Sequence, residues 1–197
     1  ADDGWTPLFN GRDLSGWQEI GGGQEPSWEV VDCVLSPAMP GGWLSTEREY
    51  DDFELRLEFN VSAGGNSGVY FRAPHKGRIS HTGMEIQLID ELGERYADLK
   101  DWQKSDSLYG VVAPKPGAAR RAGEWQMLTT RCVGRRLRVE LNGQQVVDTD
   151  LDSHPDAEAE HTGLKRASGY IGLQNYNGQK VQFRNIAIRE LDGEADR

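Results

Sequence analysis

Residues 82–90 read TGMEIQLID and alternate between apolar and polar side chains. Successive side chains of an extended chain point to opposite faces, so Met84, Ile86 and Leu88 share one face of a strand. Glu85 and Gln87 share the other face. The pattern predicts a β-strand with one face in a hydrophobic core, and it raises the question of what the carboxylate and the amide contact.

The same two-residue period recurs along the chain. FELRLEFN (53–60) and RLRVELNG (136–143) alternate in the same way, and the second ends in an Asn-Gly pair typical of a tight hairpin turn. No segment keeps helical spacing over ten or more residues. We therefore predict an all-β fold with two sheets packed face to face. Further strands are expected in SGVYFR, EWQMLTTRCV, GYIGLQ and VQFRNIAIREL.

Length and charge limit the possible classes of protein. A chain of 197 residues suits one β-sandwich domain, here residues 1–197. Its 22 Lys and Arg against 32 Asp and Glu give a net charge of −10. This balance argues against nucleic acid and anionic membrane surfaces as partners, because both require a positive field. No apolar run reaches 18 residues, so no membrane insertion is predicted.

The cysteines and histidines give no sign of a metal site. Cys33 and Cys132 both lie in strand-like runs, where we favour buried free thiols over the alternative of a single disulfide. The four histidines are scattered without ligand spacing, so neither a metal nor another cofactor is predicted. The chain starts without Met, as expected for a mature secreted or periplasmic form or for a trimmed one.

Several segments together resemble one family, the 3-keto-disaccharide hydrolase domain family, over about residues 4–191. The family has a concanavalin A-like (lectin/glucanase) fold, so the resemblance implies a jelly-roll sandwich that acts on carbohydrate. Its members are associated with cleaving glycosides whose C3 hydroxyl has been oxidised to a ketone. The segments that carry the resemblance are, in order, GWTPLFNGRDLSGW, WEVVDCVL, GGWLSTEREYDDFELRLEFNVSAGGNSGVYFR, GMEIQLID, LYG, GEWQMLTTRCVGRRLRVELNG and GYIGLQNYNGQKVQFRNIAIREL.

The chain departs from the family pattern at two places. Residues 172–178 read GLQNYNG, whereas such sequences usually continue from GLQ through one polar residue to His-Gly. If that His takes part in chemistry, this chain is altered or inactive; if it only shapes the loop, Tyr176 can substitute. Cys33 also stands where a glycine is usual.

Glu85 is the central candidate for catalysis. Glu85 and Gln87 are expected to stand together on one sheet surface, with Arg72 beside them if their strands are neighbours. If aromatic side chains such as Tyr70 or Tyr109 surround Glu85, its pKa is raised and it can serve as a general acid. The alternative is a solvated strand face with an ordinary ion pair.

Asp90 is the second candidate carboxylate. Strict alternation would turn it towards the core, where an unpaired charge is costly. Either the strand ends or bulges before Asp90 and turns it to the groove, or Asp90 caps the following loop. If it converges with Glu85, a separation of about 5.5 Å suits a nucleophile and acid, and ~6.5–9.5 Å admits a water molecule.

A third route fits a keto sugar better, because a ketone at C3 acidifies the proton on C2. A base removes this proton, the enolate expels the leaving group at C1, and water adds afterwards. This route needs a base near C2, a cation or donor at the ketone oxygen and an acid at the glycosidic oxygen. Our hypothesis has Glu85 or Asp90 as the base, Arg72 or Lys104 polarising the ketone, and Tyr109 donating. The candidates for substrate binding are Arg72, Gln87, Asn66, Trp102, Lys104 and Gln174.

Two functions fit the sequence best, and a structural or partner-binding domain appended to larger proteins is a third alternative. The first is a carbohydrate-active hydrolase that cleaves the glycosidic bonds of 3-keto-glucosides or 3-keto-disaccharides. The second is a non-catalytic carbohydrate-binding module of the same fold, which the missing His encourages.

Overall fold

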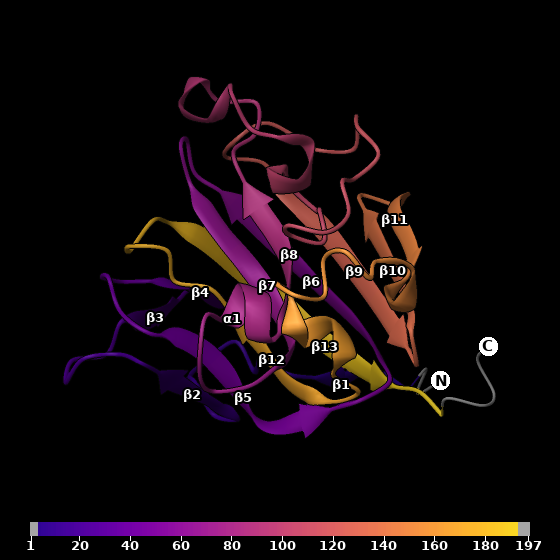
Figure 1. Cartoon of the computed structure of the whole chain (residues 1–197). Helices are drawn as coiled ribbons and strands as arrows, with labels where there is room; N and C mark the ends of the chain where they lie inside the picture. The colour runs from indigo at the N-terminus through magenta and orange to yellow at the C-terminus, as the bar shows by residue number, and fades with distance from the viewer. Residues whose placement is uncertain (1–3, 193–197) are drawn as a thin grey trace.

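The computed structural model describes residues 4–192 and consists of two antiparallel sheets packed against each other (Figure 1). The larger sheet has the strand order β11-β10-β9-β6-β13-β4-β3, with β1 beside β13, and the smaller has the order β2-β5-β12-β7-β8. This architecture confirms the predicted all-β sandwich. The ends of the predicted 1–197 domain, residues 1–3 and 193–197, lie outside the described residues.

The strands are short and one helix interrupts them. The larger sheet contains β1 (Thr6–Pro7), β3 (Trp28–Val31), β4 (Val34–Pro37), β6 (Phe53–Val61), β9 (Trp125–Val133), β10 (Arg136–Leu141), β11 (Gln144–Asp150) and β13 (Val181–Glu190). The smaller contains β2 (Trp17–Ile20), β5 (Trp43–Tyr50), β7 (Asn66–Ala73), β8 (Met84–Ile89) and β12 (Gly169–Leu173). The helix is α1 (Ile79–Thr82), and short 3₁₀ turns occur at Glu94–Tyr96, Asp101–Gln103, Leu151–Ser153 and Thr162–Lys165. Among residues 4–192, no helix is long and apolar enough to cross a membrane.

The core lies between the sheets and is built by the predicted alternation. Phe53 and Phe59 of β6 are fully buried, as are Ile86 and Leu88 of β8 on the other sheet. Phe53 meets Phe71 of β7 edge to face, with 6.2 Å between the ring centres. The outward side chains of β7, β8 and β12 therefore lie on the outer face of the smaller sheet.

The polar loop that follows β8 returns to cover the edge of the smaller sheet. The backbone nitrogen of Tyr109 donates to the carbonyl of Glu85 over 2.9 Å, and that of Asp106 donates to the carbonyl of Gln87 over 2.7 Å. An unpaired edge strand exposes backbone groups, and this segment satisfies them. As a result, Tyr109 lies directly beside Glu85.

Two hairpin turns place paired residues at positive φ. Asn142 and Gly143, between β10 and β11, have φ values of 52° and 80°, which confirms the predicted hairpin. Between β3 and β4, Asp32 and Cys33 have φ values of 50° and 62°. Glycine adopts this conformation without strain, whereas Cys33 holds it with a Cβ atom present.

The structure tests the expectation of two buried free thiols. Cys33 and Cys132 are both free, as predicted, and Cys132 is buried. The prediction is wrong for Cys33, which is exposed because it lies in the turn and not within a strand.

Candidate active site

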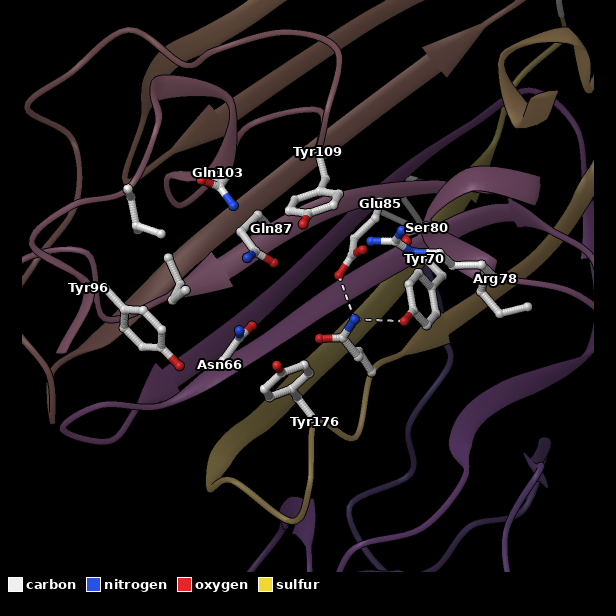
Figure 2. A pocket seen from close by; sticks show the side chains of 14 residues that line it. Asn66, Tyr70, Arg78, Ser80, Glu85, Gln87, Tyr96, Gln103, Tyr109 and Tyr176 are labelled. Carbon is white, nitrogen blue, oxygen red and sulfur yellow. Dashed lines mark hydrogen bonds between the residues drawn. The ribbon is translucent and has the colours of Figure 1, made fainter. Parts of the chain in front are cut away.

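A cavity of about 410 Å³ opens on the outer face of the smaller sheet, above β7 and β8 (Figure 2). Side chains from both strands form its floor, and those from the polar loop and from the segment before α1 form its walls. Figure 2 shows Asn66 and Tyr96 at one side of the cavity and Tyr70 and Arg78 at the other. The lining polar residues are Asn66, Tyr70, Arg78, Ser80, Glu85, Gln87, Tyr96, Gln103, Tyr109, Gln174 and Tyr176.

A glycine makes room for the central carboxylate. Gly68 of β7 lies in register with Gln87 of β8, next to Glu85. A Cβ atom on Gly68 would lie only 2.0 Å from Oε1 of Glu85, so the carboxylate occupies the space that a side chain would take. Glu85 is 2% exposed. The carboxylate of Glu85 is thus buried at the sheet surface because Gly68 beside it has no side chain.

Burial controls the charge of Glu85. Loss of solvation raises the pKa of its carboxyl from 4.5 to about 8, and the positive charge of Arg78 opposes this shift. Burial thus favours the protonated form of the Glu85 carboxyl at neutral pH.

One amide links Glu85 to a tyrosine. Nε2 of Gln174 donates to Oε1 of Glu85 over 2.9 Å and to the hydroxyl oxygen of Tyr70 over 2.7 Å, as the dashed lines in Figure 2 mark. Both N–H groups of the amide are then used. Burial and the nearby Glu85 charge raise the pKa of Tyr70, so its hydroxyl stays protonated.

Two acceptors in the cavity lining have no partner. Oδ1 of Asn66 and Oε1 of Gln174 are buried and receive no hydrogen bond. Buried polar atoms in proteins are usually paired, so such atoms call for a ligand or a bound water. Hydroxyl groups of a sugar would supply the missing donors.

The structure brings five of the predicted site residues together. The alternation in TGMEIQLID turned Glu85 and Gln87 to the same face, and both line the cavity. Asn66, Tyr109 and Gln174 line it as well. The predicted neighbourhood of Glu85 and Tyr70 is also present, since the two residues are in register across β7 and β8.

Arg72 was expected beside Glu85, and the structure corrects this placement. Its φ of 45° breaks the alternation of β7, and its side chain leaves the face that Tyr70 occupies. The guanidinium is buried and donates to the carbonyl oxygens of Asp51 and Gly134, and to Asp52 over 3.1 Å. Arg72 therefore holds loops together and does not line the cavity.

Asp90 also lies outside the cavity lining. The strand β8 ends at Ile89, and Oδ2 of Asp90 accepts from the backbone nitrogen of Gly64 over 2.9 Å. The carboxylate thus caps the turn between β6 and β7 instead of the loop that follows it. Glu85 and Asp90 do not form the predicted pair of carboxylates in one cavity.

The two candidates from the polar loop point elsewhere. Lys104 forms an ion pair with Asp101 over 2.6 Å and lines a neighbouring cavity of about 450 Å³. Trp102 packs edge to face against Tyr109, with 5.7 Å between the ring centres, and is not part of the lining. Its place in the structure is to support Tyr109, in contrast to the predicted contact with substrate.

Sequence reasoning missed the cation of the site. Arg78 precedes α1, which packs against β7 and β8, and this packing brings the guanidinium to the cavity. Its surroundings in the sequence, KGRIS, carry no motif that would have indicated this position. Tyr176 also lines the cavity, from the GLQNYNG segment that lacks the usual His, and is 43% exposed.

Comparison with solved structures defines the class of protein. A carbohydrate-binding module from Bacillus subtilis superposes with a TM-score of 0.59 and 14% identity, over 89% of this chain and 96% of the other. Such a likeness shows the sandwich fold, which confirms the predicted concanavalin A-like fold. A protein from Parabacteroides distasonis, provisionally named a glycosyl hydrolase, is more similar, with a TM-score of 0.82 and 27% identity over 96% of this chain and 95% of the other.

The sequence comparison gives the family. The family model described as the 3-keto-alpha-glucoside-1,2-lyase-like domain matches residues 4–189, so the chain belongs to this family. A 3-keto-disaccharide hydrolase from Bacteroides thetaiotaomicron is 27% identical, over 96% of this chain and 79% of the relative. The chain is thus a carbohydrate-active protein of the glycosyl hydrolase type.

Proposed function

We propose that the chain cleaves the glycosidic bond of 3-keto-glucosides by elimination, with Glu85 as the base. One observation carries this proposal: Glu85 is the only carboxylate among the described residues that line the cavity. Ordinary glycosidases use two carboxylates that flank the scissile bond. A cavity with a single carboxylate suits a reaction in which the substrate's own ketone activates the bond.

The reaction begins at C2. The C3 ketone makes the C2 proton acidic, and the Glu85 carboxylate removes this proton. The negative charge then moves to the ketone oxygen, where the cation of Arg78 stabilises it. The enolate expels the oxygen at C1, and addition of water to the resulting double bond yields the free keto sugar. A lyase-like family description and a relative named as a hydrolase both agree with elimination followed by hydration.

The burial of Glu85 suits it to this role. A general base works best when its pKa is close to the working pH, and the pKa of Glu85 is about 8. Only the carboxylate form accepts the C2 proton. The rate should therefore rise with pH and level off above about pH 8.

Other lining groups fit the remaining needs of the reaction. The hydroxyl of Tyr70 or of Tyr109 can protonate the leaving oxygen, since both side chains line the cavity. The unpaired oxygens of Asn66 and Gln174 would accept hydrogen bonds from sugar hydroxyls. Arg78 takes the place that the sequence-based hypothesis gave to Arg72 or Lys104.

The test compares a 3-keto-disaccharide with the unoxidised disaccharide, both in D₂O. We expect release of monosaccharide from the keto substrate alone, with deuterium at C2 of the keto product. The keto product incubated with protein under the same conditions measures background exchange. Cleavage of both disaccharides at similar rates, or cleavage without deuterium above background, would contradict elimination.

A second candidate function is a carbohydrate-binding module without turnover. The absence of the usual His in GLQNYNG and the fold shared with a carbohydrate-binding module favour it. Saturable binding of the keto-disaccharide without any released product would establish this function instead.

A further inference from the structure

A second hollow of about 330 Å³ adjoins the cavity on the same face of the smaller sheet. The two share the side chains of Tyr70, Ile79 and Gln174 as a common wall. The far side of the second hollow is formed by Trp43 of β5 and by His75, which follows β7. We call this second hollow the Trp43 subsite.

The aromatic side chains of the Trp43 subsite are held in place. Trp43 meets Tyr70 edge to face, with ring centres 5.4 Å apart, and meets His75 at 5.8 Å. His75 in turn stacks on Tyr170 at 3.8 Å, and its Nε2 lies 3.0 Å from the hydroxyl of Ser45. A ligand would meet an aromatic surface that needs no ordering on binding.

A glycine again creates the space. A Cβ atom on Gly172 of β12 would lie 2.2 Å from Cζ3 of Trp43, so the indole lies against the sheet where Gly172 has no side chain. Gly68 does the same for Glu85. Glycines on the adjacent strands β7 and β12 therefore open two neighbouring places on one sheet face.

The chemistry of the Trp43 subsite fits a neutral sugar ring. No Asp, Glu, Lys or Arg occurs among its described lining residues, and burial lowers the pKa of His75, which favours its neutral form. Aromatic rings offer a surface for the C–H groups of a pyranose, and the Gln174 amide lies at the edge. A charged ligand would find no counter-ion among these described lining residues.

We propose that the Trp43 subsite binds the departing sugar of a disaccharide while the keto ring occupies the cavity beside Glu85. This inference rests on the proposed function and adds to it a binding place for the second ring of the substrate. The glycosidic oxygen then lies over the wall that both hollows share, at Tyr70.

This placement selects the proton donor. The hydroxyl oxygen of Tyr70 already accepts from Gln174, so its own hydrogen is free to point at the glycosidic oxygen. As the bond between C1 and that oxygen breaks, the Tyr70 proton passes to the oxygen of the departing sugar. The water that then adds to the double bond supplies hydroxide to C1 and returns a proton to Tyr70. Tyr109 lines the cavity but not the Trp43 subsite, whereas Tyr70 lines both.

The experiment compares a 3-keto-disaccharide with the corresponding methyl 3-keto-glucoside, which lacks the second ring. Trp43→Ala should lower kcat/KM for the disaccharide roughly tenfold and leave the methyl glycoside within about twofold. Trp43→Phe should restore most of the loss. Trp125→Ala, a change on the other sheet, should leave the ratio of the kcat/KM values for the two substrates unaltered. Equal losses on both substrates, or no loss on either, would overturn the proposal.

Binding separates this inference from the proposed function. Calorimetry on Glu85→Gln, with and without Trp43→Ala, measures affinity for both ligands without turnover. Weaker binding of the disaccharide alone supports the subsite even if the wild type cleaves nothing. An unchanged affinity ratio, or no binding of either ligand, overturns it.

A comparison of two leaving groups tests whether Tyr70 donates the proton. Tyr70→Phe should slow cleavage of the disaccharide by about a hundredfold, yet spare 4-nitrophenyl 3-keto-glucoside, whose leaving group needs no proton. Tyr109→Phe should not discriminate between these two substrates. A Tyr70→Phe loss that is equal for both leaving groups would contradict proton donation by Tyr70.

Discussion

The strands β6 and β8 carry the same alternating pattern, yet their outward carboxylates lie in opposite surroundings. On β6, the carboxylate of Glu58 accepts from Nε of Arg184 over 2.8 Å and from Nδ2 of Asn185 over 2.7 Å. On β8, Glu85 is buried and accepts from a neutral amide. Glu58 on β6 forms an ordinary ion pair, which was the alternative considered for Glu85. Glu85 on β8 is instead a desolvated carboxylate.

The difference arises from the strands alongside. Glu58 is in register with Arg184 of β13, so a cation stands directly opposite it. Glu85 is in register with Tyr70, and Gly68 leaves space for it to sink. Burial raises the pKa of Glu58, but hydrogen bonds from Asn185 and Arg184 outweigh it, so the pKa falls below its usual value. Alternation determines which way a side chain points, and the neighbouring strands determine its charge.

The largest expected effect is on turnover. Glu85→Gln removes the proposed base and should lower kcat for a 3-keto-disaccharide by about 10²-fold or more. Glu58→Gln, the matched change on β6, should leave kcat within about twofold, because Glu58 lies on the other sheet. Steady-state assays of both variants at pH 8 measure the contrast. Similar rates for wild type and Glu85→Gln would remove Glu85 from the mechanism.

The second prediction concerns stability against pH. Between pH 4.5 and about 8 the unfolded chain has lost the Glu85 proton while the folded protein still holds it. Relative to Glu85→Gln, the wild type should therefore lose up to about 1.4 kcal/mol of unfolding free energy per pH unit over this range. Urea unfolding of both proteins from pH 5 to 8 measures this slope.

Glu58 should give the opposite sign when the same measurement is extended below pH 4.5, because its pKa is lowered from 4.5 in the folded protein. Its lowered pKa means that its contribution is present above its unfolded pKa and is lost as the pH falls towards the folded value. The unfolding free energy of the wild type relative to Glu58→Gln should thus increase as the pH rises from acid. Relative to Glu85→Gln it should decrease as the pH rises. Parallel pH profiles for the two variants would show that their surroundings do not differ as described.

The third prediction removes the space beside Glu85. Gly68→Ala places a methyl group against Oε1 of Glu85 and should cost about 1–3 kcal/mol of unfolding free energy, with a loss of kcat. Gly23→Ala is the control, because nothing lies within 4 Å of its Cβ position. Thermal unfolding and turnover of both variants test the point. Full activity in Gly68→Ala would mean that Glu85 has another position open to it.

The same contrast explains which parts of the site were predictable. Period-two patterns placed Glu85 and Gln87 on one face, because alternation is a local property. Arg72 was misplaced because a single positive φ within β7 turns its side chain away, and nothing in SGVYFR indicates that. Arg78 was missed because its position depends on how α1 packs against the sheet. Contacts between segments distant in sequence determine where the side chains of Arg72 and Arg78 lie.

The smallest effect is expected for the ion pair on β6. Glu58→Gln should lower the free energy of unfolding at pH 7 by about 0.2–1 kcal/mol, since partly exposed ion pairs contribute little after solvent screening. The loss should shrink as salt is added, because mobile ions screen such a pair. Urea unfolding at low and high ionic strength measures it. A loss above about 2 kcal/mol that does not change with salt would mean that the neutral amide of Asn185 contributes most of the stabilisation of Glu58. The surroundings of Glu58 on β6 and Glu85 on β8 would then be more alike than described.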